Sequence, residues 1–243
     1  GGFTWLTGTA SMAFGGLGIV LFGGTVLYTA YKSFPPKLYR AEQKIGELLN
    51  LSEIENIHPP IKMLALIGPI RSGKTTLKEH IGFFPRSQDR TQTVSAQVIA
   101  VYANSATKYI AALDGAGDIY DQQLSMVKLA DYVCILIDHN DIDQDHTIVS
   151  DRLKGVNLFM EQMRHALSSQ GQLKKKWIKI IVNKKDLWEK NNDEQVTDFK
   201  TFCSDQLEAW RNSNLADKVE LIYHSNLSSD DINIFVNNLK ADL

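Results

Sequence analysis

Residues 64–77 read LALIGPIRSGKTTL, an apolar run followed by a glycine, four other residues and then Gly73, Lys74 and Thr75. Its first part belongs to IKMLALIG, a short apolar run with branched side chains, which is typical of a buried strand. Its second part opens KTTLKEHIG, whose pattern predicts a helix that begins directly after a glycine. The segment from Gly68 to Thr75 is therefore expected to form the turn between a strand and a helix.

The residues of this turn match the spacing G-x-x-x-x-G-K-[ST]. Backbone N–H groups of such a loop point inward, and the helix N-terminus adds its dipole, so the loop is expected to bind phosphate oxygens. Lys74 would neutralise the β- and γ-phosphates, and Thr75 would place its hydroxyl on Mg²⁺. A turn that merely connects two elements is the competing interpretation. The predicted nucleotide-binding residues here are Gly68, Arg71, Ser72, Gly73, Lys74, Thr75 and Thr76.

A second strand, in WIKIIVNKKDLW, ends at residues 183–186, which read NKKD. This string resembles the N/T-K-x-D guanine-reading motif of the Ras-like GTPase superfamily. A carboxylate at Asp186 can accept hydrogen bonds from the ring N–H and the exocyclic amine of guanine, whereas adenine offers no matching pair of donors. The wrong base would leave this charge unpaired. The resemblance implies that Asn183 tethers the site and that the stem of Lys184 covers the base.

Further site residues follow from the resemblance alone. In IAALDGAGD, the D-x-x-G element corresponds to Asp114, which would hold a water on Mg²⁺, and to Gly117, whose N–H would contact the γ-phosphate. The switch threonine that closes on Mg²⁺ is expected at Thr93, and Thr91 is the alternative. The predicted metal site therefore consists of Thr75, Thr93 and Asp114.

The segment LIYHSNLS resembles the short guanine-contacting loop usually written S-A, with Ser225 as its serine and the N–H of Asn226 reaching the base. Asn226 stands where this motif usually has alanine. The resemblance covers residues 61–243 and implies an α/β P-loop G domain. Its mostly parallel sheet would have six strands near residues 62–67, 95–103, 107–113, 132–137, 177–182 and 219–223, with helices on both faces.

Two departures from the family pattern bear on hydrolysis. Asp118 stands where Ras-like enzymes usually carry the glutamine that orients the attacking water, which predicts slow hydrolysis. Ile70 replaces a glycine and would crowd the approach of a partner's arginine. Arg71 is expected to reach solvent, and a cation supplied in cis is the alternative. The predicted catalytic residues are Lys74, Thr93, Gly117 and Asp118.

A membrane span is expected in front of this domain. Residues 3–31 carry no charge and are long enough to cross a hydrocarbon core of about 30 Å as a helix. The apolar region is too long for a cleaved signal peptide, the competing interpretation. Small residues at four-residue multiples suit a partner helix in the membrane, although membrane helices also tolerate glycine in general. The chain starts at Gly1 rather than Met, so the question of whether residues precede Gly1 is left open.

The flank after this span is basic. It has four basic residues and one acidic residue, namely Lys32, Lys37, Arg40, Lys44 and Glu42. The positive-inside rule therefore predicts a single-pass protein with its main domain in the cytoplasm. The expected organisation is an anchor over residues 1–34, an amphipathic juxtamembrane helix and linker over 35–60, and the GTPase domain over 61–243.

The overall composition excludes one class of partner. The 243 residues are 44% hydrophobic and 22% charged, with 26 basic and 28 acidic side chains. No basic tract is large enough to follow a nucleic-acid backbone, so nucleic acid is not an expected partner. Cys134 and Cys203 lack metal-ligand or CxxC spacing and are predicted to be reduced packing residues.

These features predict a membrane-anchored GTPase switch. Its expected partners are guanine nucleotide with Mg²⁺, membrane lipid through the N-terminal span, and a protein recruited to the switch surface. A GTP-bound structural subunit of a membrane complex, with little or no hydrolysis, is the alternative. An ATP-driven motor is disfavoured by Asp186 and by the absence of a second catalytic carboxylate beside Asp114.

Overall fold

The computed structural model describes residues 37–82, 94–103, 106–115, 120–169 and 176–242. Contacts divide the chain into two compact units, Gly1–Leu38 and Tyr39–Leu243, and every described helix and strand belongs to the second. The membrane span predicted over residues 3–31 lies outside the described residues. Within the described ranges, no helix is both long enough and apolar enough to pass through a bilayer.

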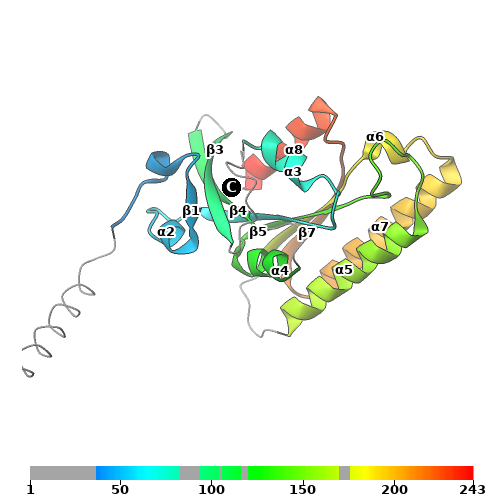
Figure 1. The fold of residues 1–243 in the computed structure, drawn as a ribbon, viewed down its shortest axis with the longest axis horizontal. Helices are drawn as coiled ribbons and strands as arrows, with labels where there is room; N and C mark the ends of the chain where they lie inside the picture. The colour runs from blue at the N-terminus through cyan, green and yellow to red at the C-terminus, as the bar shows by residue number, and fades with distance from the viewer. Residues whose placement is uncertain (1–36, 83–93, 104–105, 116–119, 170–175, 243) are drawn as a thin grey trace, which may run out of the picture. The chain divides into compact units, whose positions relative to one another are not determined.

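A sheet runs through the centre of the second unit (Figure 1). In the described ranges it has seven strands in the order β1-β3-β4-β2-β5-β6-β7. Neighbours from β4 to β7 are parallel, whereas β3 is antiparallel to both β4 and β1. The strands are β1 (Leu48–Asn50), β2 (Lys62–Ile67), β3 (Ser95–Ala103), β4 (Ala106–Asp114), β5 (Tyr132–Ile137), β6 (Lys176–Val182) and β7 (Ala216–Tyr223).

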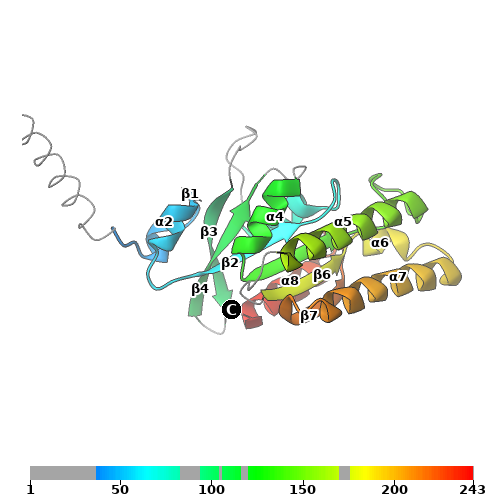
Figure 2. The same cartoon turned by 90° about the horizontal axis from the view of Figure 1, so that it is seen from below.

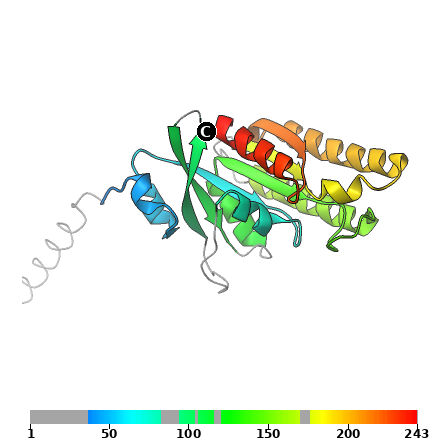
Figure 3. The same cartoon turned by 90° about the horizontal axis from the view of Figure 1, so that it is seen from above.

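Helices cover both faces of the sheet, because parallel neighbours need crossover connections. Helices α4, α5 and α7 lie on one face, which Figure 2 shows in front. Helices α3 and α8 lie on the other face, which Figure 3 shows from above. The described helices are η1 (Ala41–Lys44), α2 (Leu51–Glu55), α3 (Lys74–His80), α4 (Tyr120–Leu129), α5 (Ser150–Ser168), α6 (Lys185–Trp188), α7 (Asp193–Asn212) and α8 (Ser229–Asp242).

Successive side chains of the central strands supply two separate cores. Leu64 and Leu66 of β2 belong to the core that includes Phe235 of α8. Ala65 and Ile67, between and after them, belong to the core on the opposite face. Because side chains of a strand alternate between the faces of a sheet, a strand covered on both sides must be apolar throughout. This requirement explains the continuous apolar runs from which the strands were predicted.

The structure of residues 39–60 differs from the prediction. The single amphipathic helix expected here is wrong, and the chain instead forms η1, β1 and α2. Leu49 is 3% exposed while its neighbour Leu48 is 47% exposed, which is the two-residue period of a strand. Strand β1 pairs antiparallel with β3, so over the described residues the sheet has seven strands rather than six. The apolar residues of this segment belong first to an edge strand and then to a short helix. Their combined spacing resembles that of a single amphipathic helix.

The six predicted strands are confirmed to within three residues at each end. Both cysteines are also confirmed as packing residues, since Cys134 of β5 and Cys203 of α7 are free thiols buried in the interior. Burial raises the pKa of each thiol to about 12, so neither is a thiolate at neutral pH.

The strand assignment of residues 48–50 predicts opposite results for two adjacent leucines. Leu49→Ala is expected to lower the free energy of unfolding of the full chain by about 2–4 kcal/mol, because it empties a buried position. Leu48→Ala is the matched control and is expected to change it by less than about 0.5 kcal/mol. Urea denaturation measures both. Equal losses for the two variants would contradict the strand and favour a helix with both leucines on its apolar face.

Candidate functional site

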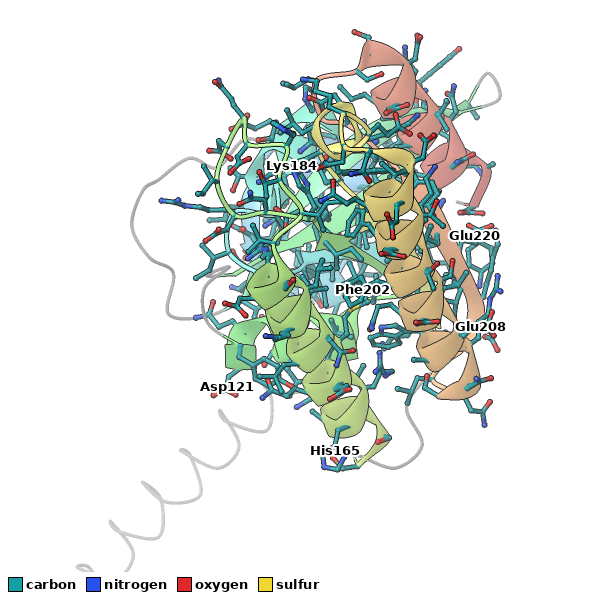
Figure 4. All side chains as sticks on the ribbon, turned by 90° about the vertical axis from the view of Figure 1, so that its right-hand side faces the viewer. Asp121, His165, Lys184, Phe202, Glu208 and Glu220 are labelled. Atoms are coloured by element: carbon teal, nitrogen blue, oxygen red, sulfur yellow. The ribbon has the colours of Figure 1, made fainter. Side chains whose placement is uncertain are left out.

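The carboxyl ends of β2, β5, β6 and β7 lie at one edge of the sheet, and most predicted site residues follow these ends. Strand β2 has β4 on one side and β5 on the other, so the chain leaves it at a point where crossovers turn in opposite directions. Crevices that bind ligands form at such points in open α/β sheets. Figure 4 shows Lys184 at the end of the unit where α5 and α7 begin, opposite His165.

The loop between β2 and α3 is shaped by two glycines with positive φ. Gly68 has φ 147°, and a Cβ atom there would lie 2.1 Å from the carbonyl oxygen of Leu136. Gly73 has φ 93°, and its Cβ would lie 2.2 Å from Nδ2 of Asn183. A side chain at either position would strain the backbone and collide with a neighbouring loop. The two motif glycines are therefore required by the conformation that the loop adopts.

Two polar side chains of this loop, those of Ser72 and Lys74, are candidates to contact a ligand. Ser72 is fully buried, and among the described residues its hydroxyl oxygen has no hydrogen-bond partner. The ammonium of Lys74 donates to the carbonyl oxygens of Gly68 and Pro69, at 2.8 and 2.6 Å. A buried hydroxyl without a partner costs free energy that a bound anion can recover. The glycine turn, the helix N-terminus and Lys74 together fit a phosphate group.

Side-chain amides join the loop to the ends of β6 and β7. Nδ2 of Asn183 donates to the carbonyl oxygen of Ser72 at 2.9 Å, and its Oδ1 accepts from the backbone N–H of Asn226 at 3.3 Å. Nδ2 of Asn226 donates to the carbonyl oxygen of Gly73 at 3.0 Å. These bonds connect three loops that lie far apart in the sequence. The tethering role predicted for Asn183 therefore has a definite geometry.

A histidine supports the amide of Asn226. Nε2 of His224 lies 2.9 Å from Oδ1 of Asn226, and this oxygen can only accept, so the ring nitrogen carries the hydrogen. Burial lowers the pKa of His224 below its ordinary value, which favours the neutral ring. The orientation of Asn226 is thus held from both sides.

The predicted base-reading carboxylate has a partner on the neighbouring loop. The hydroxyl of Ser225 donates to Oδ1 of Asp186, and the N–H of Ser225 donates to Oδ2 of Asp231 at 2.9 Å. The N–H of Lys185 donates to the carbonyl oxygen of His224 at 3.0 Å. The NKKD segment and the HSN segment therefore form one structural unit.

A buried carboxylate organises Lys184. Asp138, at the end of β5, has a fully buried side chain that accepts from Nε of Arg152 at 2.7 Å. Nζ of Lys184 lies 3.0 Å from its other oxygen and donates to the carbonyl oxygen of Asn140 at 2.8 Å. Arg152 also donates to the carbonyl oxygen of Ile70, at 2.9 Å. The two cations compensate the buried charge and link the phosphate loop to the NKKD segment.

The carboxylate expected at a magnesium ion is already paired. Oδ1 of Asp114 lies 2.7 Å from Nζ of Lys78, which is on α3 one turn after Lys74. Thr75 is exposed at the start of α3, and Thr93 lies outside the described residues. Across the described ranges, no cluster of three or more His, Cys, Asp or Glu residues is placed to hold a metal ion. Asp114, the carboxylate of the predicted metal site, is thus engaged by an ammonium group in this structure.

The remaining predicted residues divide into two groups. Arg71 and Thr76 are exposed, and their predicted roles at a bound nucleotide stay predictions. Thr91, Thr93, Gly117 and Asp118 lie outside the described residues, and their predicted roles stay predictions.

Several residues of the site were missed from the sequence, among them Asp138, Arg152 and Lys78. Asp138 could have been predicted as a site residue from the sequence, because it directly follows a buried strand, as Asn183 does. Arg152 and Lys78 could not have been predicted, because each reaches its partner only across the folded site.

The seven-stranded α/β arrangement, with a glycine loop between β2 and α3, fits a P-loop G domain. No protein-family model and no curated protein matches the chain. Among solved structures, the chain is similar to translation elongation factor SelB from Methanococcus maripaludis in complex with the GTP analogue GppNHp. The TM-score is 0.47 at 15% identity, and the match covers 74% of this chain and 33% of that chain. A similarity at this level adds no weight to the geometry described above.

The contact between Gly73 and the asparagines predicts a sharp difference between two glycines. Gly73→Ala is expected to lower the free energy of unfolding by about 2–4 kcal/mol, because it adds backbone strain and displaces buried amides. Gly155→Ala, in an open helical position of α5, is the control and is expected to raise it by about 0.5–1 kcal/mol. Urea denaturation of the full chain measures both. Wild-type stability in Gly73→Ala would contradict the packed arrangement of the loop.

Proposed function

We propose that the protein binds guanine nucleotides, with the phosphates in the loop after β2 and the base at Asp186. The observation that carries this proposal is the set of hydrogen bonds that joins the two motifs. Asn183 bonds to the carbonyl of Ser72 in the loop, and Asp186, on the same NKKD segment, is bonded to Ser225. One ligand with phosphates at one end and a base at the other suits this pairing of sites.

The chemistry of Asp186 favours guanine over adenine. A carboxylate only accepts hydrogen bonds, and guanine presents two adjacent donors, its ring N–H and its exocyclic amine. Adenine has no such pair, so it would leave a partly buried charge without compensation. The bond from Ser225 holds the carboxylate in one orientation while its second oxygen remains available for a base.

The proposed reaction is slow hydrolysis of GTP to GDP and phosphate. Lys74 would move from the loop carbonyls to the β- and γ-phosphates, which offer a stronger charge-assisted contact. Asp118 would orient water less effectively than an amide, because its charge lies beside a centre where negative charge accumulates. Magnesium is not part of this proposal, since Asp114 is paired with Lys78.

The proposed cellular role is that of a switch at the cytoplasmic face of a membrane. The uncharged residues 3–31 and the basic flank that follows support a single-pass anchor in this orientation. Bound GTP would order the segments around Thr93 and Gly117, and that surface would recruit a protein partner.

A second candidate function is a GTP-bound structural subunit of a membrane complex. The specific observation in its favour is Ile70, whose side chain is 59% exposed on the phosphate loop. A branched apolar side chain at this position obstructs an arginine that a partner would insert to accelerate hydrolysis. Together with Asp118, this feature favours retention of GTP.

The base assignment predicts the nucleotide preference of one variant. In equilibrium titrations of the full chain, Asp186→Asn is expected to bind GTP about 10–100-fold more weakly, since one charged hydrogen-bond acceptor is lost. The ratio of its affinity for GTP to its affinity for ITP, which lacks the exocyclic amine, is also expected to fall towards one. Asp198→Asn, at an exposed position of α7, is the matched control. An unchanged preference in Asp186→Asn would refute the base assignment.

The same purified chain separates the two candidate functions. GTP is bound in a single turnover, and the nucleotide on the protein is identified by chromatography over hours. Conversion to GDP is the result expected of a slow switch. Intact GTP on the protein would instead support the structural subunit.

The basic flank predicts the membrane orientation. Protease added to sealed vesicles with their cytoplasmic face outward is expected to remove the chain beyond Lys37. Detergent-opened vesicles are the control for protease activity. Protection of that region in the sealed vesicles alone would reverse the proposed orientation.

A further inference from the structure

Two lysines follow the phosphate loop on α3, and only the first belongs to the motif. Lys74 and Lys78 are four residues apart, so they lie one above the other on the same side of the helix. Like charges at this spacing destabilise a helix by a few tenths of a kcal/mol. Lys78 is also only 8% exposed, and a buried ammonium is costly unless it is paired. Its position therefore needs a compensating interaction.

That interaction is made with Asp114 at the end of β4. Strand β4 pairs with β2, so its end lies beside the start of the phosphate loop. Nζ of Lys78 is 2.7 Å from Oδ1 of Asp114, which is the short distance of a charge-assisted hydrogen bond. The two side chains are 10% and 23% exposed. The pair thus lies largely out of solvent, where removing either partner would leave a poorly solvated charge.

The pairing changes what this part of the site offers to a cation. A hard divalent ion binds where anionic oxygens are available. At Asp114 it would meet a pair without net charge, whose ammonium already occupies one carboxylate oxygen. Repulsion from Lys78, or the loss of the buried pair, would oppose the binding of the ion.

We propose that Lys78 takes the place of a divalent cation, so that the protein binds guanine nucleotide with little dependence on Mg²⁺. Lys74 then supplies the positive charge that faces the phosphates, and Lys78 neutralises the carboxylate that a divalent ion would otherwise compensate. This inference rests on the proposed function, because it concerns the nucleotide bound at the same loop.

The test is the affinity of the full chain for GTP, measured by titration calorimetry in excess MgCl₂ and again in EDTA. For the wild type, the two dissociation constants are expected to differ by less than about threefold. In Lys78→Met, the affinity in EDTA is expected to fall by at least about tenfold, because Asp114 is left as an uncompensated charge. Excess MgCl₂ is expected to restore most of the loss, since the free carboxylate can then hold the ion.

Two further variants are controls, one for the charge at position 78 and one for the loss of a lysine elsewhere on the surface. Lys78→Arg keeps the cation and is expected to retain the wild-type ratio of dissociation constants. Lys154→Met removes an exposed lysine that pairs with Asp151 on α5, and it is expected to bind as the wild type does in both buffers. An effect confined to Lys78→Met supports the inference.

Three results would overturn it. A wild-type affinity that falls more than about a hundredfold in EDTA shows that the ion is required, and this measurement needs no variant to fold. Equal ratios of dissociation constants in the wild type and Lys78→Met show that Lys78 does not replace the ion. Both results leave the proposed function intact, whereas failure to bind GTP in either buffer refutes the proposed function and this inference together.

Discussion

The hydrogen bond from the amide of Asn183 to the carbonyl of Ser72 is the contact on which the site depends. It spans 111 positions of the chain and connects the end of β6 to the loop after β2. Its geometry requires Gly73, because any Cβ there would occupy the place of that amide. Asn226 adds a second bond to the same turn, so the loop is held by the segments that follow β6 and β7. A phosphate loop held in this way is organised before any ligand arrives, which lowers the entropic cost of binding.

Charge pairs complete the site around this contact. Asp138 is buried between Arg152 and Lys184, and Asp114 is paired with Lys78. Asp114 ends β4 and Asp138 directly follows β5, and the carboxyl ends of both strands lie at the same edge of the sheet. Side chains of the protein thereby neutralise acidic groups near a loop suited to anions. This arrangement reduces the repulsion that free carboxylates would exert on a polyphosphate.

Helix α8 and the end of α3 stabilise the side of the site assigned to the base. Asp231, in the first turn of α8, accepts from the N–H of Ser225, while His80 of α3 lies 3.1 Å from the carbonyl oxygen of Asn226. The segment that positions Asp186 is therefore held by two helices on the same face of the sheet. Loops supported from several elements keep their geometry, and base discrimination depends on geometry of this kind.

The sequence by itself determined the strands of the parallel sheet, the glycine loop and the positions of the NKKD and HSN segments after their strands. These features depend on local properties, namely apolar runs imposed by burial on both faces and residue types that one turn requires. Only the tertiary structure decided the strand β1, because an edge strand followed by a short helix has no distinctive period. It also decided the partners of Lys78 and Arg152, which lie 36 and 82 positions away along the chain. Local patterns carry no record of such pairs, since a charged side chain is compatible with many positions until the fold brings its partner within reach.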